Sequence, residues 1–190
     1  LISSLLLLVI VSLINPVAKE RVFDQTLNQM NLKNLDIESN QKNQIYIFSK
    51  NHHEIYISAF KMFLDNKFLG VGVKNFRKFC NDEKYKFGDL SCTSHPHNTF
   101  IQILVETGII GFLFLLFILF YFFKYLLIHL IYKFKKKDYF TDFEICILSG
   151  ILIYLWPFIP TGNFFNNWLT IIMILNLPFL LWSRKVIKSV

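Results

Sequence analysis

The chain has 190 residues, of which 54% are hydrophobic and 17% are charged. Soluble domains have about 45–50% apolar and about 25% charged residues. Neither figure decides the class alone, but the apolar residues fall into long runs with the charges between them, and this distribution favours a membrane protein. The formal net charge is +7. Because the densest basic residues lie beside apolar runs and no nucleic-acid motif accompanies them, we interpret them as topology signals and expect no nucleic-acid partner.

Four apolar segments predict membrane helices, since a spanning helix needs about 20 mostly apolar residues. The first, Leu1–Val17, has no charged start and no cleavage site, so we expect the end of a membrane helix rather than a signal peptide. We also expect preceding helices to be missing from the chain. The other three segments are Ile101–Phe123, Phe143–Pro160 and Phe164–Trp182. Pro157 and Pro160 predict a kink or an early end in the third.

Basic residues predict the orientation of these segments, because cytoplasmic loops are enriched in Lys and Arg. The two basic clusters are Lys133, Lys135, Lys136 and Lys137 in one loop, and Arg184, Lys185 and Lys188 in the tail. Both fall on the cytoplasmic side if each segment crosses once. The predicted fold is therefore an all-α, multi-pass integral membrane protein. Residues 18–98 form one large periplasmic loop, and residues 99–190 form three helices with a basic cytoplasmic loop and tail.

The periplasmic loop divides by pattern. Lys19–Lys50 is polar, rich in Asn and Gln, and predicted to be irregular. Apolar residues then recur at helical spacing, which predicts an amphipathic helix over His53–Leu64, on the membrane surface or against other helices. Gly70 and Gly72 supply a tight backbone turn.

Cys80 and Cys92 lie further along the same loop. The oxidising periplasm permits a disulfide between them. The alternative is two free thiols.

A histidine-containing junction leads from this loop into the next apolar segment. Thr99-x-x-Gln102 matches a capping box, which predicts a helix start near Thr99. Free backbone N–H groups and the partial positive charge at a helix start suit a phosphate or diphosphate. His97 would lie just before the first turn, where a neutral imidazole could accept a proton. The alternative is a loop histidine with a structural hydrogen bond.

Polar and small residues continue along this predicted helix. Asn98, Gln102 and Glu106 are four residues apart and should form one polar stripe. A carboxyl group at membrane depth is costly without a partner, so Glu106 is a functional candidate, or else an acid favoured by the helix dipole. Gly108 and Gly111 should let a neighbouring helix approach closely.

The junction resembles a known family signature. His97-Asn98, nine residues, then Gly108-Ile109-Ile110-Gly111 is similar to the H-N-x9-G-x-x-G pattern of the O-antigen ligase and polymerase superfamily. The stretch from Phe63 to Gly72, followed by Asn75-Phe76, resembles the sequence that precedes this pattern. The resemblance covers about His52–Phe120. It implies the C-terminal portion of a membrane glycosyltransferase of the bacterial inner membrane, with its site on the periplasmic face.

The resemblance also implies substrates and residue roles. A glycan would pass from undecaprenyl diphosphate to lipid A–core or to a growing polysaccharide, without a metal or other cofactor. His97 would be catalytic, activating the acceptor hydroxyl or positioning the diphosphate. Arg77, His52 and Asn98 would bind the diphosphate, with His52 standing where many members have arginine. Gly70, Gly72, Gly108, Gly111 and Glu106 would support the site.

Three other functions fit parts of the pattern. Glu106 and the proline-broken third segment are compatible with a transporter or channel fragment. A metal-binding outer domain could use His52, His53, His95 and His97, although their spacing matches no closed site. A related oligosaccharyltransferase acting on protein shares nearly all features of the first interpretation.

Overall fold

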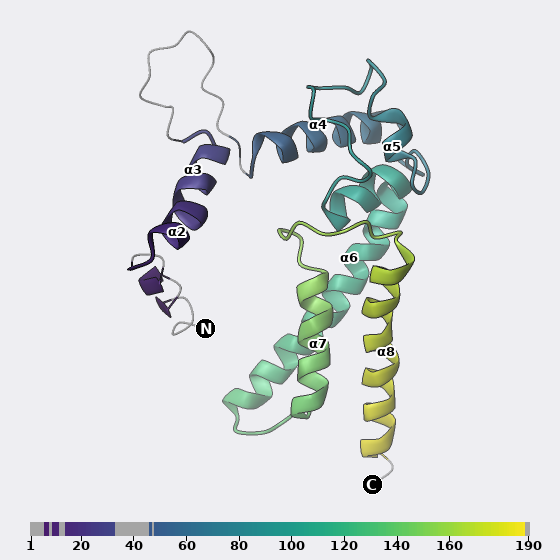
Figure 1. Cartoon of the computed structure of the whole chain (residues 1–190). Helices are drawn as coiled ribbons and strands as arrows, with labels where there is room; N and C mark the ends of the chain where they lie inside the picture. The colour runs from purple at the N-terminus through teal and green to yellow at the C-terminus, as the bar shows by residue number, and fades with distance from the viewer. Residues whose placement is uncertain (1–5, 8, 12–13, 33–45, 47, 189–190) are drawn as a thin grey trace. The chain divides into compact units, whose positions relative to one another are not determined.

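The computed structural model describes residues 6–7, 9–11, 14–32, 46 and 48–188. These residues form helices and connecting turns, with no strand among them. The chain divides into two compact units, Leu1–Glu54 and Ile55–Val190. Figure 1 shows the course of the helices, and each unit is described separately below.

The described part of the first unit includes the short helical elements α2 (Pro16–Lys19), the π-helix η1 (Glu20–Asp24) and α3 (Gln25–Gln29). Asn15 caps α2, since its Oδ1 accepts hydrogen bonds from the N–H groups of Val17 and Ala18. The prediction of irregular structure from Lys19 onward is therefore wrong for this part, because Asn-Pro is a helix start signal that the polar composition concealed. Residues 33–45, and much of the predicted span Leu1–Val17, lie outside the described residues.

The second unit holds most of α4 and all later helices. Their bounds are α4 Lys50–Asp65, α5 Phe76–Phe79, α6 Thr99–Phe134, α7 Asp142–Tyr154 and α8 Asn167–Lys188. The amphipathic helix predicted over His53–Leu64 is confirmed as α4. Its Ile55, Ala59 and Met62 are buried in a cluster with Phe76 of α5 and Val105 of α6. This face of α4 therefore packs against protein.

The three predicted spans of this unit correspond to α6, α7 and α8, with different ends. α6 is longer than predicted at both ends, and α8 continues six residues past Trp182 to Lys188. α7 ends at Tyr154, so the early end predicted from Pro157 and Pro160 is confirmed. Among the described residues, α6 is the one helix long and apolar enough to cross a membrane.

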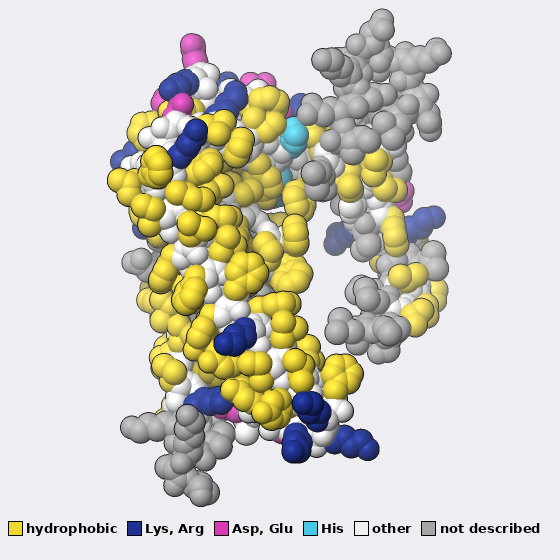
Figure 2. Space-filling view, turned by 180° about the vertical axis from the view of Figure 1, so that it is seen from behind, with side chains coloured by type: hydrophobic (Ala, Val, Ile, Leu, Met, Phe, Trp, Pro, Cys, Tyr) yellow, Lys and Arg dark blue, Asp and Glu magenta, His cyan; other side chains and the backbone are white. Residues whose placement is uncertain are grey.

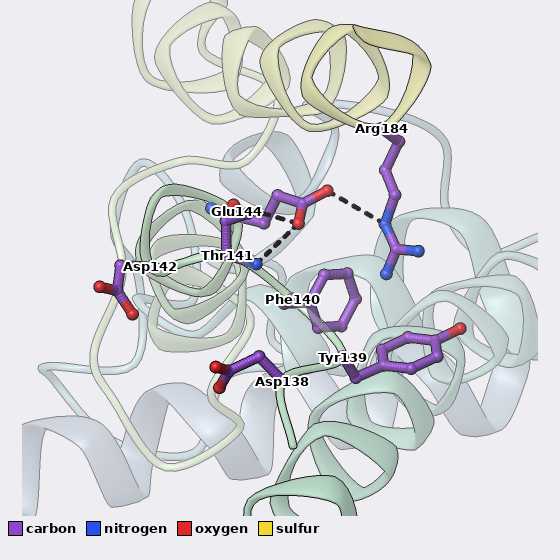
Figure 3. Close-up of a pocket in the computed structure, with 7 residues that line it drawn as sticks. All are labelled: Asp138, Tyr139, Phe140, Thr141, Asp142, Glu144 and Arg184. Atoms are coloured by element: carbon purple, nitrogen blue, oxygen red, sulfur yellow. Dashed lines mark hydrogen bonds and ion pairs between the residues drawn. The ribbon is translucent and has the colours of Figure 1, made fainter. Parts of the chain in front are cut away.

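An ion pair joins α7 to α8 near the end of the chain. Glu144 Oε1 lies 3.1 Å from Arg184 Nε, and the Arg184 guanidinium also lies over the ring of Phe140 (Figure 3). The start of α7 therefore lies beside the end of α8. In Figure 2, hydrophobic side chains cover the helices of this unit, and Lys and Arg side chains lie at both their upper and their lower ends.

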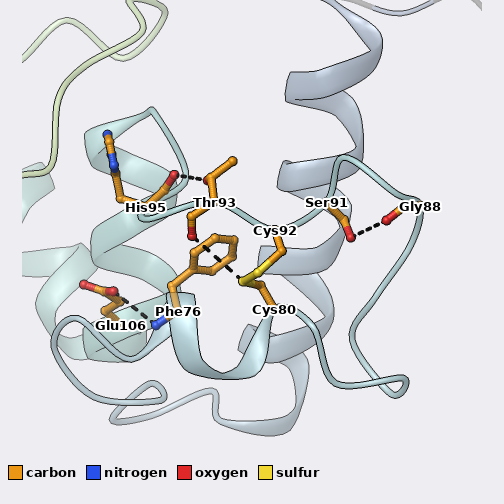
Figure 4. The surroundings of a disulfide bond; sticks show 8 residues. All are labelled: Phe76, Cys80, Gly88, Ser91, Cys92, Thr93, His95 and Glu106. Carbon is orange, nitrogen blue, oxygen red and sulfur yellow. Dashed lines mark hydrogen bonds between the residues drawn. A yellow bond between two sulfur atoms is a disulfide. The ribbon is translucent and has the colours of Figure 1, made fainter.

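A disulfide joins Cys80, at the end of α5, to Cys92, twelve residues later (Figure 4). The Cys80 Sγ lies 3.9 Å from Thr93 O, and Thr93 Oγ1 donates a hydrogen bond to His95 O at 2.6 Å. The disulfide therefore fastens the segment that leads into the histidine junction.

Replacing Cys80 and Cys92 together by Ser is expected to destabilise this loop by about 3 kcal/mol, because the cross-link limits the freedom of the unfolded loop. Limited trypsin digestion at Lys84 and Lys86 is the measurement, with faster cleavage expected. Cys146, which is free and exposed, provides the control through Cys146→Ser. Equal cleavage rates in the double variant and this control would contradict the prediction.

Candidate functional site

α6 is interrupted at Gly108, where φ is 68° and ψ is −166°. In a straight helix, Phe100 and Phe112 would lie about 18 Å apart along the axis. Their ring centroids are instead 6.3 Å apart, and both rings belong to one apolar cluster. The segment 99–107 therefore folds back against the start of the segment 109–134. The uninterrupted span predicted over Ile101–Phe123 is wrong, because hydropathy does not register a break in the backbone.

Gly70 and Gly108 allow two backbone segments to touch at this break. Both have a φ of 68°, in the left-handed region that favours glycine. A Cβ on Gly108 would overlap the carbonyl of Phe68, and a Cβ on Gly70 would overlap the backbone between Glu106 and Gly108. Gly108 was predicted to admit a neighbouring helix. It admits the turn 67–72 instead, because that turn lies against the broken helix.

The turn 67–72 also replaces hydrogen bonds that the break removes from α6. In an uninterrupted helix, the carbonyls of residues 105 and 106 would accept from residues 109 and 110. Three backbone hydrogen bonds take their place: Val71 N to Val105 O (2.9 Å), Gly72 N to Glu106 O (3.0 Å) and Ile109 N to Lys67 O (2.8 Å). Buried backbone groups need such partners, so the turn and the break stabilise each other.

Gly111 has a different role from Gly108. A Cβ there would overlap the Thr107 hydroxyl, which donates a hydrogen bond to Ile103 O at 2.7 Å. The two glycines of the G-x-x-G pattern therefore serve one bend. The first adopts the left-handed conformation, and the second leaves room for the side chain before it. The nine residues between Asn98 and Gly108 are the short helix that precedes the bend.

Asn98 is the N-cap of α6. Its Oδ1 accepts from the N–H groups of Phe100 (3.0 Å) and Ile101 (3.1 Å), and its Nδ2 donates to Pro157 O (2.7 Å). The predicted helix start at Thr99 is confirmed, but the predicted capping residue is wrong. Asn98 takes the role because its backbone is extended and its short amide reaches the first turn.

This cap changes the predicted anion site. Two of the first N–H groups of α6 are already bonded to Asn98, so they are not open to a diphosphate. Asn98 itself is buried, and its amide has protein partners on both atoms. The side chain therefore fixes the helix start. Its predicted contact with a diphosphate stays a prediction.

Gln102 and Glu106 form a buried polar network on the short helix, both with an exposed fraction of at most 1%. Gln102 Nε2 donates to Glu106 Oε2 (3.1 Å), and Phe76 N donates to Glu106 Oε1 (3.3 Å). The predicted polar stripe is present. Glu106 has partners from α5 and faces a protein contact rather than lipid, so the observation that suggested a transporter has a structural explanation.

His97 is the partly exposed residue of an otherwise buried junction. His95, Pro96, Asn98 and Thr99 are all buried around it. Its φ of 56° lies in the left-handed region, which costs a non-glycine residue about 1–3 kcal/mol. The ring lies 4.2 Å from that of His95, centroid to centroid. The fold therefore holds this side chain at the surface in an uncommon backbone conformation, as is frequent at functional sites.

His95 is a site residue that spacing in the sequence did not identify. Ser94 Oγ lies 2.9 Å from its Nδ1, and Thr161 O lies 3.3 Å from its Nε2. Because a carbonyl accepts, Nε2 must carry a proton and donate. Burial lowers the pKa of His95, the neighbouring His97 lowers it further, and the bond to Thr161 acts in the opposite direction.

The lowered pKa of His95 predicts acid sensitivity. The unfolded chain, with the usual His pKa of 6.5, binds a proton before the folded chain does, so stability falls as the pH drops below 6.5. Melting temperatures of the full-length protein in detergent at pH 7.5 and 5.5 measure this. The difference should shrink in His95→Gln, which removes the titrating ring. An unchanged difference in that variant would contradict the assignment.

The predicted diphosphate ligands lie on different elements: Asn98 caps α6, Arg77 lies on α5, and His52 lies in the part of α4 that belongs to the first unit. Arg77 is exposed on α5 and interacts electrostatically with Glu106, which lies eight residues, or about 12 Å along the helix, from Asn98. His52 belongs to the first unit, where its Nδ1 lies 2.8 Å from Ser49 Oγ. In the described part of the chain, no three His, Cys, Asp or Glu side chains are grouped as metal ligands.

Comparison with protein families identifies a matching family. A family model described as O-antigen ligase matches residues 1–116, which include the turn 67–72, the histidine junction and both glycines of the bend. No curated protein and no solved structure matches the chain.

Proposed function

The chain belongs to the O-antigen ligase family, and on this basis we propose that it is part of a membrane glycosyltransferase. The proposed enzyme moves a glycan from undecaprenyl diphosphate to an acceptor hydroxyl at the periplasmic face of the bacterial inner membrane. The acceptor is lipid A–core for a ligase, or a growing polysaccharide for a polymerase.

The observation that carries this proposal is the position of the His97 side chain. A partly exposed imidazole stands at the surface of a buried junction, held in the left-handed backbone conformation. In the proposed reaction, the neutral ring accepts the proton of the acceptor hydroxyl as that oxygen attacks the anomeric carbon. The bond from the anomeric carbon to the diphosphate breaks, and undecaprenyl diphosphate leaves.

Negative charge develops on the leaving diphosphate, so its stabilisation is a second requirement. The helix N-terminus is already capped by Asn98, which leaves cationic side chains to supply this charge. We assign the role to Arg77, an exposed residue of α5, whose guanidinium suits bidentate binding of phosphate. No metal or other cofactor is part of this proposal.

Membrane insertion of α6, α7 and α8 completes the proposal. Many of their large apolar side chains are exposed, which is typical of a surface that contacts lipid or further helices. Examples are Phe114 (65%), Phe117 (66%), Ile172 (64%) and Leu181 (70%). The basic residues Lys133, Lys135, Lys136 and Lys137 between α6 and α7 support a cytoplasmic position for that loop. The histidine junction, which precedes α6, would then face the periplasm.

Deleting the gene in its host and examining the surface polysaccharide tests the proposed function. Polymer that stays on the carrier and does not reach the core identifies a ligase. Single repeat units on the core identify a polymerase. Unchanged polysaccharide, together with an unglycosylated protein, would favour a protein acceptor and contradict both assignments.

A further inference from the structure

The loop between α7 and α8, residues 155–166, crosses the start of α6 in Figure 1. Thr161 contacts the histidine junction at three points. Its N–H donates to His97 O at 2.9 Å, and its hydroxyl lies 2.9 Å from the Thr99 hydroxyl. Its carbonyl accepts a hydrogen bond from His95 Nε2 at 3.3 Å. One residue therefore binds both histidines and the first residue of the helix.

The hydrogen bond from Thr161 N to His97 O fixes the peptide that follows His97. That peptide determines ψ of His97, at the residue whose φ is already 56°. The bond from His95 to Thr161 O holds the neighbouring ring, whose centroid lies 4.2 Å from the His97 ring. Thr161 thus restrains the backbone of His97 directly, and it restrains the His97 ring through its contact with His95.

The loop itself is fastened on both sides of Thr161. Before it, Pro157 O accepts from Asn98 Nδ2 at 2.7 Å. After it, Asn163 Oδ1 accepts from Gln102 Nε2 at 2.8 Å, and Phe164 N donates to Gln102 Oε1 at 2.9 Å. Gln102 is fully buried. Thr161 is therefore held in place by the same helix whose start it contacts.

We propose that Thr161 is a positioning residue for His97, which makes the α7–α8 loop part of the active site. This loop lies beyond residue 116, where the match to the family ends. The proposal rests on the proposed catalytic role of His97. A loop that only packed against the helix start would affect stability and would leave the orientation of the His97 ring unchanged.

Three substitutions in the full-length protein separate the contacts of Thr161. Thr161→Ser keeps the N–H and the hydroxyl, Thr161→Val removes the hydroxyl, and Thr161→Pro removes both groups. The carbonyl that accepts from His95 remains in all three variants. The first readout is the rate at which diethyl pyrocarbonate modifies His97, measured by mass spectrometry, with His53 as the internal reference. The second is kcat and KM for glycan transfer.

The Ser variant is expected to match the parent in both readouts. The Pro variant is expected to change the modification rate of His97 and to lower kcat about tenfold with little change in KM, the loss expected when one hydrogen bond that orients the catalytic ring is removed. The Val variant should lie between them. Where Thr161→Pro fails to fold in gel filtration, a backbone ester at position 161 removes the same N–H without the proline ring.

The outcomes distinguish the two proposals. Unchanged His97 modification and unchanged kcat in the Pro or ester variant would overturn the role of Thr161. A changed modification rate with unchanged kcat would support the positioning of the ring and contradict the catalytic role of His97. Lower thermal stability, without a change in either readout, would assign Thr161 to packing alone.

Discussion

Replacing His97 by Ala is expected to abolish detectable glycan transfer while the protein still inserts into the membrane. The imidazole is the proposed acceptor of the hydroxyl proton, and general acid–base groups typically contribute about 10²–10⁴-fold to the rate. A gene-deleted strain that carries the variant should accumulate carrier-linked glycan, as the deletion does. Gel analysis of core-linked and carrier-linked polysaccharide gives the measurement.

The matched control is His97→Asn. Asn tolerates the left-handed conformation better than Ala does, so this variant removes the ring with less effect on the backbone. Both variants should lose transfer to the same extent, because the ring is the shared loss. Formation of the Cys80–Cys92 disulfide reports that the loop has been exported and folded. Normal transfer in His97→Asn would exclude the proposed role, and loss in His97→Ala alone would point to the backbone.

Local patterns in the sequence predicted the parts of the site that depend on neighbouring residues. The apolar spacing around His53–Leu64 predicted α4. The start of α6 at Thr99 was also predicted, although its capping residue, Asn98, was not. Gly70 and Gly72 were predicted to form a turn, and both have positive φ. These features follow from helical periodicity, capping and the conformational freedom of glycine, which act over a few residues.

The contacts that assemble the site were not predictable in the same way. Thr161 is more than sixty residues from His97, and nothing in their local sequences indicates that they meet. The bend at Gly108 has no hydropathy signal, since the residues on both sides are apolar. Glu106 was placed at membrane depth for that reason, whereas the bend brings it to α5. Each of these features depends on tertiary contacts of the folded chain.

Gly108→Ala is expected to have the largest effect on stability. Its methyl group would overlap the carbonyl of Phe68, which is backbone and cannot rotate away, and its φ of 68° is unfavourable for Ala. Strain of about 1–3 kcal/mol and overpacking of about 1–3 kcal/mol together predict a loss of roughly 2–6 kcal/mol. Thermal unfolding of the full-length protein in detergent measures this loss, and glycan transfer should fall with it.

Gly150→Ala is the matched control, because Gly150 lies within α7 and a Cβ there would meet no atom within 4 Å. Ala is the better helix former by about 1 kcal/mol, so this variant should be as stable as the parent or more so. If Gly108→Ala lowers the stability and Gly150→Ala does not, the helices are not sensitive to every added methyl group. The backbone contact at Gly108 is then what holds the bend. A Gly108→Ala variant as stable as Gly150→Ala would mean that the turn 67–72 does not lie against α6. The bond from Ile109 N to Lys67 O, and with it the short helix that presents His97, would then need another explanation.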